Sequence, residues 1–116
     1  MSRLIEKLTE YGADITGILE RFLEDEELYE SCIETFYSDT GFNNLGIAIL
    51  NKQYDAAFNY AHTLKGVTGN MGLTPLYNSI VDLVEALRNK EYSLVETQYT
   101  DMMKEYNKSK DFFFSK

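Results

Sequence analysis

Residues 54–72, YDAAFNYAHTLKGVTGNMG, decide the fold of this 116-residue chain. An α-helix advances about 100° per residue. On that wheel, Ala61, Leu64, Thr68 and Met71 all lie within roughly 40° of Ala57, so this face holds only small or apolar side chains and one threonine. Such a stripe is typical of a helix that packs against a core. We therefore expect a helix over 54–71, ended by Gly72, since glycine commonly terminates helices.

The outer face of this helix carries the only histidine of the chain, His62. Gly66 and Gly69 follow one and two turns later, and Lys65 lies at the edge of the face. Each glycine inside a helix costs about 1 kcal/mol relative to alanine. We interpret Gly66 and Gly69 as clearance that lets a second macromolecule approach the imidazole. Close packing of another helix, as in a dimer, is the alternative use of these glycines.

An exposed imidazole with room for a partner suits phosphoryl transfer. A neutral imidazole is a nucleophile, and the phosphoramidate that it forms with phosphorus has a labile P–N bond. A serine phosphate ester is too stable for reversible relay. Lys65 lies three residues from His62, close enough to offset the negative charges of a phosphoryl group. The alternative role of Lys65 is that of a surface charge.

Helical periodicity continues on both sides of this stretch. Apolar stripes predict further helices over 4–11, 15–22, 26–36, 42–52, 75–88 and 92–111. Asp14 is expected to cap the second helix, and Thr74 with Pro75 to begin the sixth. The composition of SDTGFNN, residues 38–44, favours a turn. Long amphipathic helices joined by short loops predict an all-α antiparallel bundle.

The third helix and the C-terminal segment also carry apolar and aromatic residues. The apolar side of the third helix is predicted to consist of Leu28, Tyr29, Cys32 and Phe36. The aromatic run DFFF, residues 111–114, either closes the bundle or forms an exposed patch, and Asn70 either caps its helix or bonds to a partner.

Length, net charge and the numbers of cysteine and histidine residues exclude several classes of partner and site. The length predicts one domain over residues 1–116. A net charge of −8 disfavours nucleic acid and anionic membranes as partners. The single Cys32 leaves no internal disulfide and fits a reducing compartment, so we expect a cytoplasmic protein. One His and one Cys are too few for a zinc site, and no phosphate-binding ATP loop is present.

The residues around the histidine resemble the histidine-containing phosphotransfer (HPt) domains of multistep two-component phosphorelays. The family motif His-x-Leu-Lys-Gly is matched by HTLKG, residues 62–66, followed by Gly69 and Gly72. The surrounding stretch 56–88, AAFNYAHTLKGVTGNMGLTPLYNSIVDLVEALR, and the upstream stretch 20–39, ERFLEDEELYESCIETFYSD, are also similar to the family. Val67 and Thr68 depart from it, because very small residues are frequent at their positions.

The resemblance implies a four-helix bundle with short additional N-terminal helices. It also implies that His62 is the phosphoacceptor, exchanging a phosphoryl group with receiver-domain aspartates, that Lys65 helps to hold that group, and that Gly66 and Gly69 serve partner docking. The chain itself is expected to need no metal or other cofactor, since the receiver brings Mg²⁺. The expected partners are a response-regulator receiver domain and a hybrid histidine kinase.

The chain is accordingly predicted to be a monomeric phosphocarrier without kinase activity of its own. The competing interpretation is an interaction module of the same fold that binds a receiver, or another signalling partner, without carrying phosphate. An enzyme with a helical active site is a third class, but the sequence offers no second cluster of converging polar groups.

Overall fold

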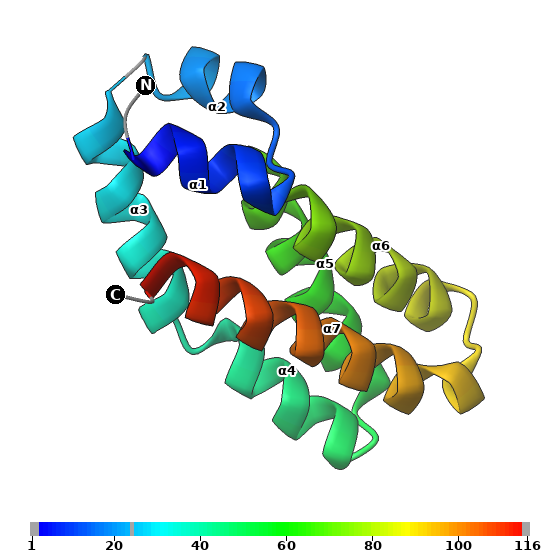
Figure 1. Cartoon of the computed structure of the whole chain (residues 1–116). Helices are drawn as coiled ribbons and strands as arrows, with labels where there is room; N and C mark the ends of the chain where they lie inside the picture. The colour runs from blue at the N-terminus through cyan, green and yellow to red at the C-terminus, as the bar shows by residue number, and fades with distance from the viewer. Residues whose placement is uncertain (1–2, 24, 115–116) are drawn as a thin grey trace.

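The computed structural model describes residues 3–23 and 25–114, so the predicted domain extends past the described residues at both ends. Within those ranges the secondary structure is entirely helical (Figure 1). The helices in chain order are α1 (Arg3–Tyr11), α2 (Ile15–Arg21), α3 (Glu26–Ser38), α4 (Gly41–Leu50), α5 (Tyr54–Asn70), α6 (Thr74–Arg88) and α7 (Tyr92–Phe114).

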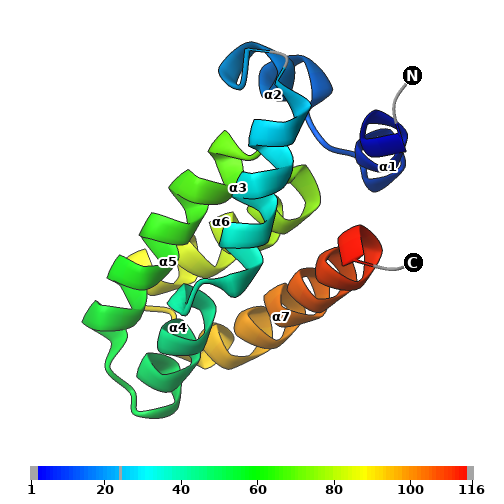
Figure 2. The same cartoon turned by 90° about the vertical axis from the view of Figure 1, so that its left-hand side faces the viewer.

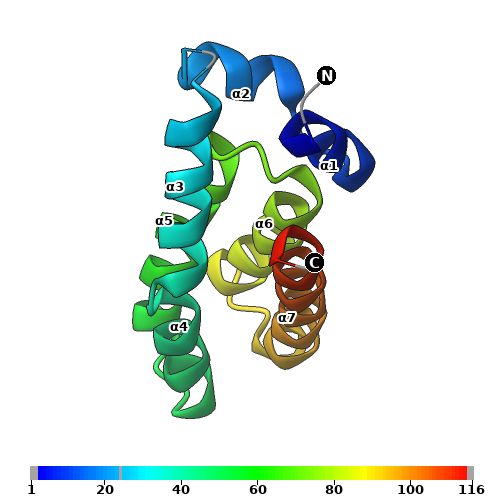
Figure 3. The ribbon, with the colours of Figure 1, turned by 60° about the vertical axis from the view of Figure 1, so that its left-hand side comes forward.

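Helices α4 to α7 form the predicted antiparallel four-helix bundle. Consecutive helices pack against one another, and α4 also contacts α7, which closes the bundle. The connections, residues 51–53, 71–73 and 89–91, are too short for anything but antiparallel neighbours. Helix α3 stacks end to end on α4, so that the pair follows one side of the molecule (Figures 2 and 3).

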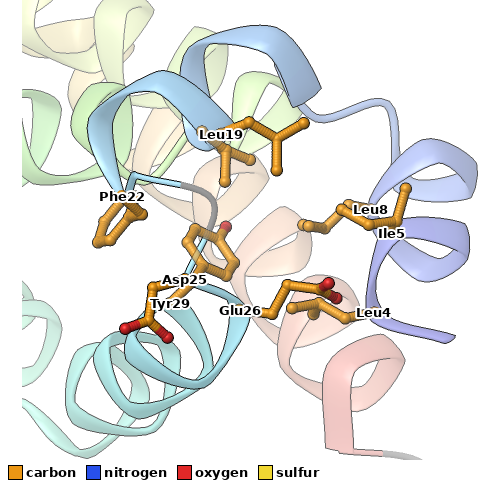
Figure 4. A pocket seen from close by; sticks show the side chains of 9 residues that line it. Leu4, Ile5, Leu8, Leu19, Phe22, Asp25, Glu26 and Tyr29 are labelled. Atoms are coloured by element: carbon orange, nitrogen blue, oxygen red, sulfur yellow. The ribbon is translucent and has the colours of Figure 1, made fainter. Parts of the chain in front are cut away.

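The short helices α1 and α2 are the additional N-terminal helices that the family resemblance implied, and they lie at one end of the molecule (Figure 1). Figure 4 shows Leu4, Ile5 and Leu8 of α1 and Leu19 of α2 lining a small pocket together with Tyr29 of α3. The cavity between the three helices measures about 10 Å³. Since a single water needs about that much space, these helices pack with almost no void.

The two central helices bury the stripes that the sequence predicts. All five residues of the stripe predicted for α5 are buried, the last of them being the C-cap residue of the helix: Ala57, Ala61, Leu64, Thr68 and Met71. The predicted stripe of α6 is buried as well: Leu76, Ile80, Leu83 and Leu87. Helical periodicity alone located this part of the core.

Helix starts were predicted with mixed success. Asp14 caps α2 as expected, with Oδ1 accepting from the Gly17 N–H at 3.1 Å. Thr74 was wrong as a cap by one position, because Leu73 is the N-cap and Thr74 is already the first helical residue. Leu73 is fully buried and has no polar side-chain atom that could cap the helix.

Two further expectations for this region were wrong. The turn predicted over 38–44 is only two residues long, Asp39 and Thr40. Helix α4 begins at Gly41, whose N–H donates to Asp39 Oδ2 at 2.9 Å. Leu28 is exposed, since α3 turns a neighbouring face inward. That face includes Ile33 and Tyr37, which the predicted stripe omitted.

The aromatic tail packs on the N-terminal half of the chain. The rings of Phe112 and Phe113 lie 6.1 and 5.4 Å from that of Tyr11 between centroids. Phe114 contacts Tyr37 edge-on at 5.6 Å but stays partly exposed. Of the two alternatives for residues 111–114, closure of the bundle is the one that the structure adopts for Phe112 and Phe113.

Gly72 joins α5 to α6 in a backbone conformation that side chains disfavour. Its φ is +69°, and a Cβ there would lie 2.5 Å from Ile18 Cγ1. We predict that Gly72→Ala lowers the free energy of unfolding by about 2–4 kcal/mol, combining left-handed strain with overpacking. Urea denaturation measures the loss. Gly66→Ala is the control and should be neutral or stabilising; equal midpoints for the two variants would contradict the prediction.

Candidate functional site

Helix α5 presents His62 because its opposite face is committed to the core. Ala57 and Ala61 are fully buried, so α5 lies close to its neighbours and cannot rotate about its axis without exposing them. His62 is one residue, or about 100°, beyond Ala61 and is exposed to solvent. The structure therefore places the imidazole on the outer face, where the sequence predicted it.

A buried hydroxyl supports the same segment from inside. The Thr68 Oγ1 donor lies 2.9 Å from the Leu64 carbonyl oxygen and 3.1 Å from that of Lys65. This satisfies a polar group that is fully buried. Thr68 thus faces the core, as the wheel predicted, and leaves the outer face clear.

The surroundings of His62 include one aromatic contact and one open position. The imidazole centroid lies 5.8 Å from that of the Phe58 ring, with 30° between the planes. At Gly66 an added Cβ would meet nothing within 4 Å. Lys65 is half-buried. His62, Lys65 and Gly66 thus lie together on α5, as their spacing requires.

Gly69 has a different environment from Gly66. An added Cβ there would lie 3.2 Å from Cε1 of Tyr77 on α6. The small size of Gly69 therefore serves the packing of α5 against α6 within the chain. A role in docking a partner stays a prediction for Gly69, because its half-buried position leaves part of it accessible.

Three residues near the histidine were missed from the sequence. Phe58 precedes His62 by four residues, a spacing that puts the two on one side of a helix and could have been noticed. The Cζ atom of Arg88 lies 5.7 Å from the centroid of the Phe58 ring, and Glu85 forms an ion pair with Arg88. Only the register between α5 and α6 brings this pair of charged residues to the site.

A groove of about 670 Å³ runs along the other flank of α5, between this helix and α3 with the start of α4. Tyr60 and Val67, 39% and 38% exposed, contribute to its lining, as does the half-buried Cys32. The side chain of Val67 lies on this flank, so it does not cover the imidazole. The outer face of α5 is thus bounded by a groove on one side and by α6 on the other.

The C-terminal end of α5 is held by a cation from α2. Arg21 donates from Nε to the Asn70 carbonyl oxygen at 2.8 Å and from Nη2 to that of Gly69 at 3.2 Å. Positive charge is favourable at this end of a helix. Arg21 therefore provides hydrogen-bond donors for two of the last carbonyl groups of α5. The side chain of Asn70 is exposed, and its role stays open between capping and partner binding.

The described part of the chain contains no group of three or more His, Cys, Asp and Glu side chains arranged to hold a metal ion. None of its helices is long and apolar enough to cross a membrane.

Of three comparisons with known proteins, the one with protein-family models found a match. Searches of curated proteins and of solved structures found no match. The family model for the Hpt domain matches residues 4–107, nearly the whole chain, and the match includes the helix that carries His62. With a four-helix bundle and an exposed histidine followed by Leu64, Lys65 and Gly66, the chain belongs to the Hpt domain family.

Proposed function

We propose that this chain is the histidine phosphocarrier of a multistep two-component phosphorelay. His62 accepts a phosphoryl group from the aspartate of one receiver domain and donates it to that of another. The observation that carries the proposal is the exposed His62 imidazole on a helix whose inner face is fully committed to the core. Membership of the Hpt family supports it, since phosphotransfer in phosphorelays is what that family does.

The chemistry needs little from this chain. A lone pair of a neutral imidazole nitrogen attacks the phosphorus of the aspartyl phosphate. As the P–N bond forms, the P–O bond breaks and its electron pair stays with the departing aspartate carboxylate. The other ring nitrogen keeps its proton, so the imidazole takes up the positive charge. The receiver supplies Mg²⁺, which offsets the charge of the transferring group.

Docking makes use of the same face. Gly66 leaves open space next to His62, and Tyr60 and Val67 present partly exposed side chains along the groove. A protein partner could bury these exposed apolar side chains in an interface. We infer that the receiver covers Gly66 and part of this groove when its aspartate reaches the imidazole.

We propose that the chain acts within a relay rather than at its start. We propose a monomeric, cytoplasmic carrier that needs no cofactor of its own and obtains its phosphoryl group from a receiver domain, including that of a hybrid kinase. The net charge of −8 makes nucleic acid an unfavourable partner.

A transfer assay tests the proposal. The chain is mixed with receiver domains of its source organism, each phosphorylated on its aspartate, in the presence of Mg²⁺. We expect acid-labile, alkali-stable phosphate to appear on the chain as it disappears from a receiver. A chain that binds a receiver but never takes up phosphate would instead support the interaction module.

Lys65 gives a second test of the proposal. Lys65→Glu reverses a half-buried charge three residues from His62, so it should slow transfer about tenfold, the cost of losing one charge-assisted contact. Lys104→Glu makes the same charge change on an exposed position of α7 and is the control. Stopped-flow transfer rates decide the result, while circular dichroism checks that helicity is retained. Equal rates for the two variants would leave Lys65 as a surface charge.

A further inference from the structure

A row of three side chains connects α6 to the phosphoacceptor. The guanidinium carbon of Arg88 lies over the Phe58 ring at 5.7 Å from its centroid, and that ring lies 5.8 Å from the imidazole of His62. The guanidinium and the imidazole are therefore separated by no more than these two distances together. Arg88 is exposed, so rotation about its side-chain bonds can move the guanidinium across part of that interval.

Arg88 already has a partner in the unphosphorylated protein. Its Nη1 atom pairs with Oε1 of Glu85, three residues earlier on α6. The two side chains are 46% and 47% exposed, and an ion pair this exposed contributes little free energy. The pair is therefore easily exchanged. Arg21 is different, because it is bonded to two backbone carbonyls at the end of α5.

We propose that Arg88 changes partner when His62 is phosphorylated: its guanidinium leaves Glu85 and bonds to the phosphoryl group, while Phe58 holds both the imidazole and the guanidinium in position. This inference rests on the proposed function. A phosphoryl group carries close to two negative charges against one on Glu85, and the planar guanidinium matches its oxygens. The face of Phe58 favours a cation along the path.

Glu85 then acts as a competitor of the phosphoryl group. In the resting protein its carboxylate keeps Arg88 away from His62. After phosphorylation it is released to solvent at small cost, because it is already half exposed. Lys65 on α5 is a second cation near the imidazole and is half-buried.

The exchange is testable without any receiver. The full chain is loaded at His62 with potassium phosphoramidate, whose P–N bond breaks to release ammonia, and the phosphoryl group is titrated by ³¹P NMR. A guanidinium beside the dianion lowers the pKa of the phosphoryl group. Arg88→Gln should therefore raise that pKa by about 0.5 unit. Lys104→Gln, the same charge change on α7, should leave it within about 0.1 unit.

The double variant Glu85→Gln/Arg88→Gln shows whether Glu85 acts on the phosphoryl group by holding Arg88 or only by its own negative charge. Glu85→Gln should lower the pKa of the phosphoryl group by freeing Arg88, and Glu96→Gln on α7 is its control. In an Arg88→Gln background, Glu85→Gln should have no more effect than Glu96→Gln. An unchanged Glu85→Gln effect in that background, or an Arg88→Gln titration equal to wild type, would overturn the proposal.

The outcomes also separate this inference from the proposed function. If no receiver transfers to the wild-type chain, the phosphocarrier proposal fails, while the titration of the chemically loaded protein still reports on Arg88. If receivers transfer normally and Arg88→Gln titrates like wild type, only the exchange fails. A wild-type chain that phosphoramidate cannot load would contradict both.

Discussion

His62→Gln is expected to abolish acid-labile phosphorylation of this chain completely. The amide nitrogen of glutamine is not a nucleophile, because its lone pair is delocalised into the carbonyl, so the P–N bond cannot form. No other histidine exists in the chain to take over. The expected result is transfer from a phosphorylated receiver below the detection limit, measured by acid-labile phosphate on the chain.

The fold should survive this change. His62 is exposed, and its one aromatic contact is with Phe58 at 5.8 Å among the contacts described for it. Losing such a contact costs at most about 1 kcal/mol, against about 5–15 kcal/mol for the stability of a domain. Calorimetry should show receiver binding close to that of wild type. Transfer that persists in His62→Gln would exclude His62 as the phosphoacceptor.

Gly66→Leu is expected to have the next largest effect, and for a steric reason. A Cβ added at this position meets nothing within 4 Å, so the leucine has room to project from the outer face beside the imidazole. It should also raise local helix stability by up to about 1 kcal/mol. We expect transfer from a receiver to fall at least about fivefold, because overpacking a close-packed contact typically costs about 1–3 kcal/mol.

The donor distinguishes blocked docking from a damaged histidine. Potassium phosphoramidate is small and needs no docking surface, so it should load Gly66→Leu as fast as wild type. Gly66→Ala is the graded control and should lose much less transfer than Gly66→Leu. If Gly66→Leu accepts phosphate from its receiver at the wild-type rate, the small size of Gly66 is not needed for receiver docking.

Gly69 shows why the two glycines of this face cannot be treated alike. A larger residue at Gly69 meets the ring of Tyr77 at the α5–α6 contact. Loss of transfer in a Gly69 variant therefore would not separate docking from stability, whereas Gly66 allows that separation. The wheel put both glycines on the face of His62, but it could not show that α6 covers the edge where Gly69 lies.

The sequence by itself determined the local features of this protein. The burial of Ala57 and Ala61, and the exposure of His62, follow from the 100° step of an α-helix. Helix ends at Asp14 and Gly72 were also readable, because a cap bond involves only residues three positions apart and a left-handed turn selects glycine. These features depend on neighbours in the chain, so no knowledge of the fold was needed.

Tertiary structure decided what lies beside the histidine. The row of Arg88, Phe58 and His62 and the contact of Gly69 with Tyr77 depend on the register of α5 against α6. That register is set by interlocking side chains across the whole bundle. Helical periodicity states which face of each helix turns inward, but the axial offset and the exposed edges result from packing between segments distant in the chain.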